Sequence, residues 1–193
     1  MSFYSGTVME LLYSMSASVT KNTYTTIAAY TGVTGTNTVC SVPAGFFSNT
    51  NPNPLGRALK VELWGTIANT AAATFANAIN INPTVATSTG NITINTAYTP
   101  TASVTAPFYV RAEITCTAFL TSTMTLQCNG EAKYHAVAAG GAPSTSAQSV
   151  GFGGTWTGLD PRVTQYVELF GTWSASSASN TTTVNQMRLY GCN

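Results

Sequence analysis

Charged side chains are scarce in this chain of 193 residues, and their scarcity narrows the functions that it can perform. They make up 7% of the residues, against about 25% in ordinary globular domains. The seven basic and six acidic residues leave a net charge of +1, and no two Lys or Arg residues lie nearer than three positions apart. Because nucleic-acid binding requires clustered basic residues, we expect no nucleic-acid partner. A nearly neutral surface also gives little repulsion between copies, which favours a subunit that packs against its neighbours.

Targeting signals and metal-ligand spacings are also missing. The first basic residue is Lys21, so the N-terminus lacks the charged leader of a signal peptide, and no run of 18 apolar residues occurs. We therefore expect no membrane association, and folding in a cytoplasm.

The four cysteines are Cys40, Cys116, Cys128 and Cys192. They have neither CxxC spacing nor partner histidines, so no metal site is expected. Cys116 and Cys128 could flank one hairpin, but a reducing compartment favours free thiols.

Residues for catalysis are few. A Ser/His/Asp triad would have to combine the single histidine, His135, with the single aspartate, Asp160, and the chain has no GxSxG elbow. Glycoside hydrolysis would need two carboxylates, and Glu62 and Glu168 are the candidate pair because they occupy equivalent positions of a repeated segment. A glutamate on a strand more commonly pairs with a nearby cation. The candidate cations are Lys60, Arg111, Arg162 and Arg188.

Cofactor motifs are absent as well. The stretch GFGGTW at residues 151 to 156 has the glycines of a phosphate loop, but no GK[ST] follows it. A bulge or a tight turn is the expected structure there. A DxDxDG calcium loop is missing too. We therefore expect no cofactor and no metal, and predict that the chain is not an enzyme.

Threonine takes the place of the missing charge. The chain has 34 threonines and is 44% hydrophobic, and β-branched residues favour strands. In PFYVRAEITCTAFL, the residues Val110, Ala112, Ile114, Cys116 and Ala118 alternate with Tyr109, Arg111, Glu113, Thr115 and Thr117. This strict alternation predicts a half-buried strand, and TMTLQCNG after a turn at 121 to 123 predicts its hairpin partner.

One six-residue segment occurs twice. VELWGT at residues 61 to 66 returns as VELFGT at residues 167 to 172. The inward face of the two predicted strands carries Leu59, Val61, Leu63 and Ile67 in the first and Val167, Leu169 and Trp173 in the second. The outward face carries Glu62 and Trp64 in the first and Glu168 and Phe170 in the second. Outward aromatics need cover from a second layer or another subunit.

These patterns predict an all-β fold in a single domain over residues 1–193. We expect an antiparallel β-sandwich of about nine to eleven strands, with a jelly roll as the favoured topology and an immunoglobulin-like sandwich or a barrel as alternatives. Residues 1–20 are expected to form a short arm or helix, because VMELLYSM has helical apolar spacing. Loops are expected at residues 48–56 and 138–149, which are rich in Asn, Pro, Gly and Ser.

Three stretches resemble a group of small virion proteins of tailed bacteriophages. They are LGRALKVELWGTIANTAAATFANAI, TPTASVTAPFYVRAEITC and TQYVELFGTWSASSASNTTTVNQMRLYG. Members of that group also begin with an LLYS-type segment and have about this length. The resemblance implies a structural component of the minor capsid, head decoration or minor tail type. No catalytic residue carries over from it.

The leading hypothesis is a capsid decoration or cementing protein. It would fold in the host cytoplasm and then bind the major capsid protein on the outer shell of the virion as a homo-oligomer, with a trimer favoured. The first alternative is a tail or fibre-associated module that adsorbs to host glycans through aromatics such as Trp156, Tyr98, Tyr109 and Trp64. A glycanase using Glu62 and Glu168 is the second. The candidate interface or packing residues are Trp64, Phe170, Trp173, Trp156, Tyr109, Arg111, Glu62 and Glu168.

Two truncations test the predicted layers. Trp64→Ala and Phe170→Ala are each expected to disturb assembly or stability, and a fully buried ring would cost about 3–5 kcal/mol in the free energy of unfolding. Thermal melting and the oligomeric state are the measurements. An unchanged melting temperature together with an unchanged oligomeric state would show that both rings are exposed.

Overall fold

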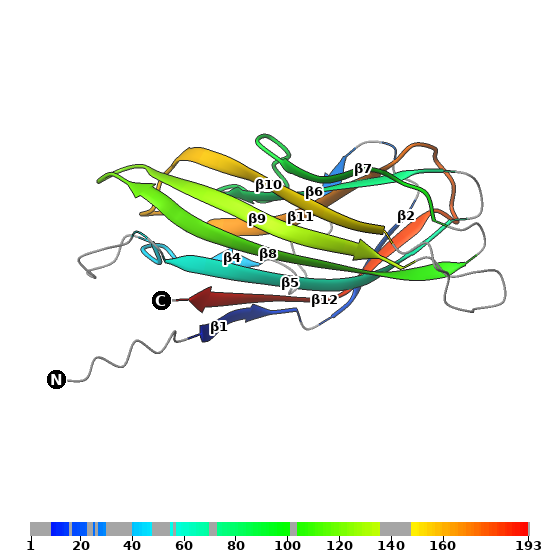
Figure 1. Ribbon diagram of the computed structural model, residues 1–193, viewed down its shortest axis with the longest axis horizontal. Helices are drawn as coiled ribbons and strands as arrows, with labels where there is room; N and C mark the ends of the chain where they lie inside the picture. Colours follow the sequence, from blue (N-terminus) through cyan, green and yellow to red (C-terminus); the bar gives the residue numbers. More distant parts are fainter. Residues whose placement is uncertain are drawn as a thin grey trace.

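Two antiparallel sheets packed face to face form the fold (Figure 1). The computed structural model describes residues 9–15, 17–22, 25, 27–29, 40–47, 55, 57–69, 73–100, 104–135 and 148–192. Twelve strands and no helix occur in these ranges, and every strand pair is antiparallel. The predicted all-β sandwich is confirmed. The strands slightly outnumber the expected nine to eleven because two of them have only two residues.

The larger sheet has seven strands. Its order is β1 (Met9–Ser14), β12 (Thr181–Cys192), β5 (Ala58–Ala68), β8 (Thr105–Phe119), β9 (Met124–Tyr134) and β10 (Gln148–Leu159), and β2 (Val19–Asn22) also pairs with β12. The predicted hairpin is confirmed as β8 and β9, whose turn is closed by a hydrogen bond from Leu120 N–H to the Thr123 carbonyl at 2.7 Å.

The smaller sheet has five strands. Its order is β3 (Ala28–Ala29), β11 (Gln165–Trp173), β6 (Phe75–Asn82) and β7 (Ile92–Tyr98), and β4 (Ser41–Val42) also pairs with β11. The meander β8–β9–β10 in one sheet is combined with chain crossings between the sheets, so the jelly-roll topology stays a prediction.

The repeated segment lies in both sheets. β5 carries VELWGT in the larger sheet and β11 carries VELFGT in the smaller one. The strand that follows each in sequence belongs to the opposite sheet, and β5 pairs with β12 while β11 pairs with β6. The two units therefore interlock, with each first strand hydrogen-bonded to the second strand of the other unit. The two copies of the repeat therefore occupy corresponding strands of one sandwich.

The core fills the space between the sheets. All the inward residues predicted on β5 and β11 are 2% exposed or less. Trp173 packs on Phe75 with ring centroids 5.2 Å apart, and Tyr98 stacks on Tyr134 at 4.6 Å. Full burial of one aliphatic side chain such as Leu63 contributes about 1.5–3 kcal/mol. Packing between the sheets therefore fixes which face of each strand points outward.

Two local expectations were wrong. The described part of VMELLYSM is the strand β1, because the edge of β12 supplies backbone partners whereas so short a helix is marginal in water. GFGGTW is part of the interior of β10, and the irregular pairing comes after it, between Trp156 and Leu159. The Ile92 side chain lies 2.9 Å from where a Cβ on Gly154 would be, so the glycine permits close contact with β7. The expected loops lie largely outside the described residues, as do residues 1–8.

A glycine substitution tests the packing of the repeat. An added Cβ on Gly65 would overlap the Phe108 ring and the Thr183 carbonyl oxygen. We expect Gly65→Ala to lower the free energy of unfolding by about 1–3 kcal/mol, because overpacking forces neighbours to move. Gly151→Ala in β10 is the control, since nothing lies within 4 Å of its Cβ position. Equal stability of the two variants in urea denaturation would contradict the packing described here.

Candidate functional site

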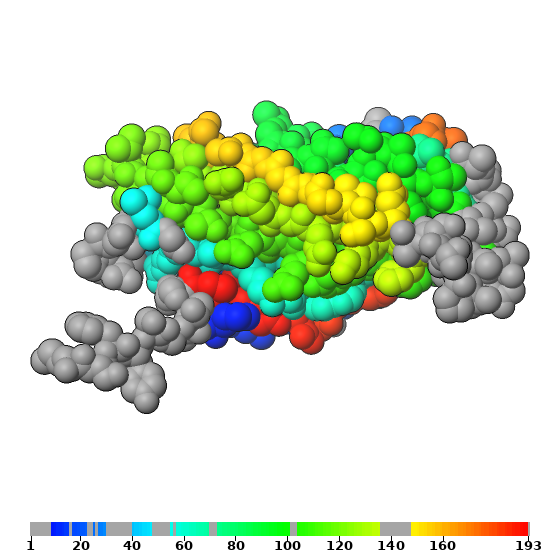
Figure 2. Space-filling view, viewed as in Figure 1, coloured from blue at the N-terminus to red at the C-terminus, as the bar shows by residue number. Residues whose placement is uncertain are grey.

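Most of the charged side chains project from the outer face of the larger sheet. Twelve residues of four adjacent strands define what we call the charged face: Lys60, Glu62, Trp64, Tyr109, Arg111, Glu113, Asn129, Glu131, Lys133, Gln186, Arg188 and Tyr190. Figure 2 views the molecule from this side, with β10 (yellow), β9 (yellow-green), β8 (green), β5 (cyan) and β12 (red) following one another down the picture. The charged face is wide and is crossed by four long strands.

Strand register arranges this face in three parallel rows. Each row is given in the order β12, β5, β8, β9. The aromatic row is Gln186, Trp64, Tyr109 and Lys133. The alternating row is Arg188, Glu62, Arg111 and Glu131, and the third row is Tyr190, Lys60, Glu113 and Asn129. In the alternating row, each charge therefore has a charge of opposite sign as its cross-strand neighbour. Such neighbours stabilise a sheet by about 0.2–1 kcal/mol per pair.

Contacts within the face hold part of it in place. Lys60 Nζ lies 2.7 Å from Glu62 Oε1, which confirms the expected cation for Glu62. The Arg188 guanidinium lies over the Trp64 ring at 5.7 Å, and Trp64 and Tyr109 have ring centroids 5.3 Å apart. Trp64 and Tyr109 are both half-buried. The face therefore presents two adjacent aromatic rings bordered by charges.

Arg111 and Glu113 are exposed on β8. Among the described residues, neither forms an ion pair with an N–O distance within 4 Å. Both border a shallow depression of about 410 Å³, whose other lining residues are Thr115, Asn129, Gly130 and Glu131. Their charges are therefore available to a partner.

The structure brings four of the sequence-predicted site residues together. Glu62, Trp64, Tyr109 and Arg111 occupy neighbouring positions of the charged face. The other four are Glu168, Phe170, Trp156 and Trp173, and none of them lies on this face. Arg188 and Tyr190 join the face because β12 lies beside β5, a pairing between segments more than 100 residues apart that no local pattern reveals.

Two aromatics proposed to stack on sugars are buried instead. Trp156 is 5% exposed, and its Nε1–H donates to the Gly90 carbonyl at 2.8 Å. Tyr98 is 4% exposed and stacks on Tyr134. Trp64 and Tyr109 are the ones that stay half-buried on an outer face.

Glu168 differs most from its predicted role. Its side chain is fully buried and has no cation partner among the described ion pairs, so the expected surface pairing is wrong. The carboxylate accepts the Ala86 N–H at 2.8 and 3.0 Å and also the Thr87 N–H. Burial raises the pKa of Glu168, and these hydrogen bonds oppose the rise. Glu168 thus anchors the connection between β6 and β7, in which Ala86 has a left-handed φ of 57°.

Asn80 holds the same connection from the neighbouring strand. It pairs in register with Glu168, and its Nδ2 donates to the carbonyls of Thr87 and Thr89 at 2.7 and 3.0 Å. The two polar side chains therefore have a structural role on the smaller sheet.

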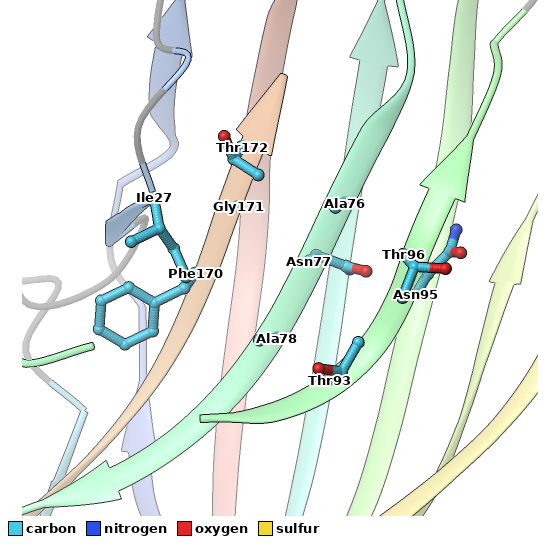
Figure 3. Close-up of a pocket in the computed structure, with 10 residues that line it drawn as sticks. All are labelled: Ile27, Ala76, Asn77, Ala78, Thr93, Asn95, Thr96, Phe170, Gly171 and Thr172. Atoms are coloured by element: carbon cyan, nitrogen blue, oxygen red, sulfur yellow. The ribbon is translucent and has the colours of Figure 1, made fainter. Parts of the chain in front are cut away.

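Phe170 lies on the outer side of the smaller sheet beside a shallow depression (Figure 3). The depression measures about 220 Å³, and small residues such as Ala76, Ala78 and Gly171 form its floor. In Figure 3, the Ile27 side chain lies next to the Phe170 ring. Phe170 is 1% exposed, so this outward aromatic is covered within the chain, as a second layer would require.

Neither catalytic combination considered from the sequence is assembled. His135 follows the end of β9 at Tyr134, which pairs with Gln148, whereas Asp160 follows Leu159, which pairs with Met124 at the other end of that hairpin. The eleven residues of β9 separate the two by roughly 30 Å. Glu62 and Glu168 lie on opposite outer faces of the sandwich, beyond the roughly 5–10 Å that a glycosidase pair requires.

The cysteines are free thiols, as expected from the sequence. Cys40, Cys116 and Cys128 are buried and Cys192 is half-buried. Burial raises the pKa of Cys128 to about 12, so its thiol stays protonated at neutral pH. Within the described ranges, no three His, Cys, Asp or Glu side chains are grouped to hold a metal ion. No helix in those ranges has the length and apolar character needed to cross a membrane.

Comparison with known proteins identifies no family. No protein-family model matches the chain, and no curated protein sequence matches it. Among solved structures, the chain is similar to the CBM2 module of the evolved Dit of Lactobacillus casei BL23 phage J-1. The identity is 10%, 97% of each chain is covered and the TM-score is 0.33, which is below the value expected for a shared topology. The resemblance to phage virion proteins stays a prediction.

Replacement of Glu168 tests the buried carboxylate. Burial raises the folded-state pKa of Glu168 above its unfolded value, so the contribution of this group to stability is fully present below the unfolded pKa and is lost as the pH rises through the folded pKa. Glu168→Gln removes this dependence, so its free energy of unfolding relative to wild type should increase from acid to neutral pH, by about 1.4 kcal/mol per unit of raised pKa. Urea denaturation across this pH range measures the difference.

The control for that experiment is Glu10→Gln, because the Glu10 side chain is exposed on β1 and does not belong to the charged face. A difference between Glu168→Gln and wild type that does not change with pH would contradict the assignment.

Proposed function

We propose that this chain is a non-enzymatic structural subunit of a phage virion, with the charged face as its assembly surface. The observation that carries the proposal is the register of β12, β5, β8 and β9, which gathers two adjacent aromatic rings and alternating charges on one wide face. Interface cores are enriched in aromatic residues and Arg, with a polar rim around them. The sequence resemblance to small virion proteins supports the same class.

The finer role that we propose is decoration of the capsid. A decoration protein contacts other proteins at many equivalent sites, so modest affinity at each site is enough to stabilise a shell through multivalency. The low net charge suits a subunit that remains packed among neutral or weakly charged neighbours. The proposed binding partner is the major capsid protein.

Adsorption to a host glycan is the second candidate. Trp64 and Tyr109 are adjacent and half-buried, and rings in this position can stack on a sugar. Gln186 and Lys133 flank them in the aromatic row and could bind hydroxyl groups. This candidate requires the same rings but no second protein.

Co-sedimentation with phage heads that lack the protein tests the proposal. The wild-type chain should sediment with the heads, and Tyr109→Ala/Arg111→Ala should bind at least about tenfold more weakly, because it removes an aromatic contact and a charge from the face. Thr93→Ala/Thr172→Ala on the smaller sheet is the matched control and should bind as wild type does.

Wild-type protein that does not sediment with heads would contradict capsid decoration. A glycan array then separates the candidates, since selective binding of one glycan that is lost in Trp64→Ala would support the adsorption module instead.

A further inference from the structure

We propose that the charged face binds a second copy of this chain, face to face, about a twofold axis that runs parallel to the strands between β5 and β8. The inference rests on the proposed function and assigns the charged face one contact within it. The face joins two copies, and the dimer then binds the major capsid protein at two sites, so variants of the face weaken head binding through the loss of bivalency. The inference replaces the threefold assembly expected from the sequence with a twofold one.

The alternating row carries the argument. Across four strands it reads positive, negative, positive, negative: Arg188, Glu62, Arg111, Glu131. The proposed axis places β5 of one copy opposite β8 of the second copy, and β12 of one copy opposite β9 of the second copy. Glu62 then faces Arg111 of the second copy, and Arg188 faces Glu131 of the second copy. Every charge of the row meets an opposite charge.

The other two rows are complementary under the same rotation. In the third row, Lys60 faces Glu113 of the second copy. In the aromatic row, Trp64 faces Tyr109 of the second copy close to the axis. Aromatic residues near the centre of an interface commonly supply most of its binding energy.

The charge pattern also selects the direction of the axis. A twofold axis along the rows, perpendicular to the strands, would bring Glu62 against Glu62 and Arg111 against Arg111. Like charges in direct opposition oppose binding. The axis parallel to the strands removes every such opposition within the alternating row.

Two of the charges that this dimer needs are not engaged in ion pairs, whereas Glu62 and Glu131 already pair with Lys60 and Lys133 on their own strands. Arg111 and Glu113 are exposed and belong to none of the ion pairs found among the described residues. The face carries four cations and three carboxylates, so two copies approach without a large net repulsion. Opposite charges also speed association at low salt.

The size and the shape of the sheet fit a dimer interface. β5 has 11 residues and is therefore roughly 37 Å long, and six neighbouring strands span roughly 24 Å. The outer face of these six strands is therefore roughly 900 Å², comparable with the about 800 Å² per partner that stable interfaces bury, and the charged face occupies its four central strands. Twisted antiparallel sheets already pack face to face in sandwiches at about −30°.

Charge reversal at the axis tests the inference in the purified full chain, without virions. Arg111→Glu and Glu62→Arg should each weaken self-association at least about 100-fold, because each brings like charges together across the axis. An equimolar mixture of the two should form a dimer, since every position at the axis is then complementary. Sedimentation velocity measures the species, and circular dichroism verifies the fold of each variant.

The double variant Glu62→Arg/Arg111→Glu covers the case in which a single reversal unfolds. It keeps opposite charges at the neighbouring positions 62 and 111 and places like charges beside Arg188 and Glu131. Across the axis, positions 62 and 111 still face each other with opposite charges, so we expect it to form a dimer with itself but none with the wild-type chain. Arg162→Glu, at an exposed turn whose Arg162 side chain is 61% exposed, makes the same change of net charge and should leave the dimer intact.

Several outcomes would overturn the inference. They are a wild-type chain that stays monomeric or forms trimers, folded single variants that still form dimers, a mixture that stays monomeric, and heterodimers between the double variant and wild type. A monomeric wild type that binds phage heads overturns this inference and keeps the proposed function. A wild-type dimer that binds no heads supports this inference and contradicts the proposed capsid decoration.

Discussion

The register of β5 against its two neighbours determines what the larger sheet presents to its surroundings. Side chains alternate with a period of two, so a slip of one residue would move Glu62 and Trp64 into the core and Leu63 to the surface. Gly65 helps to fix this register, because the Phe108 ring occupies the space that a Cβ would need. The charged rows, the aromatic pair and the core all depend on this one alignment.

Interlocking of the two repeat units extends the same constraint to the smaller sheet. Because β5 pairs with β12 and β11 pairs with β6, each repeat unit contributes one strand to each sheet. The two copies nevertheless differ in use. Glu62 lies on a surface with Lys60, whereas Glu168 is buried and holds a backbone turn. The same glutamate of the repeat thus lies on the charged face in one sheet and anchors a backbone turn in the other.

Sequence reasoning succeeded where the structure follows local periodicity. Alternation along β8 and β9 was enough to predict the hairpin and its two faces as far as Cys116, whereas Ala118, predicted to point inward, is exposed because the register shifts there. It failed for Glu168, because the Ala86 N–H that the carboxylate accepts lies 82 positions away. It failed for β1 as well, since six residues with ambiguous spacing take their structure from the edge of β12. The rows of the charged face could not be predicted from the sequence either, because they depend on which strands become neighbours.

Seven of the thirteen charged residues lie on the charged face. Their order makes the face of one copy complementary in charge to the face of a second copy. Oxidative footprinting of the purified chain over a concentration series tests most directly whether that face is an assembly surface. Labelling of Trp64 and Tyr109 should fall as the concentration rises, while Leu120, which is 69% exposed at the β8–β9 turn, should stay equally labelled. Constant labelling of both rings, or protection of Ile27 on the smaller sheet instead, would contradict it.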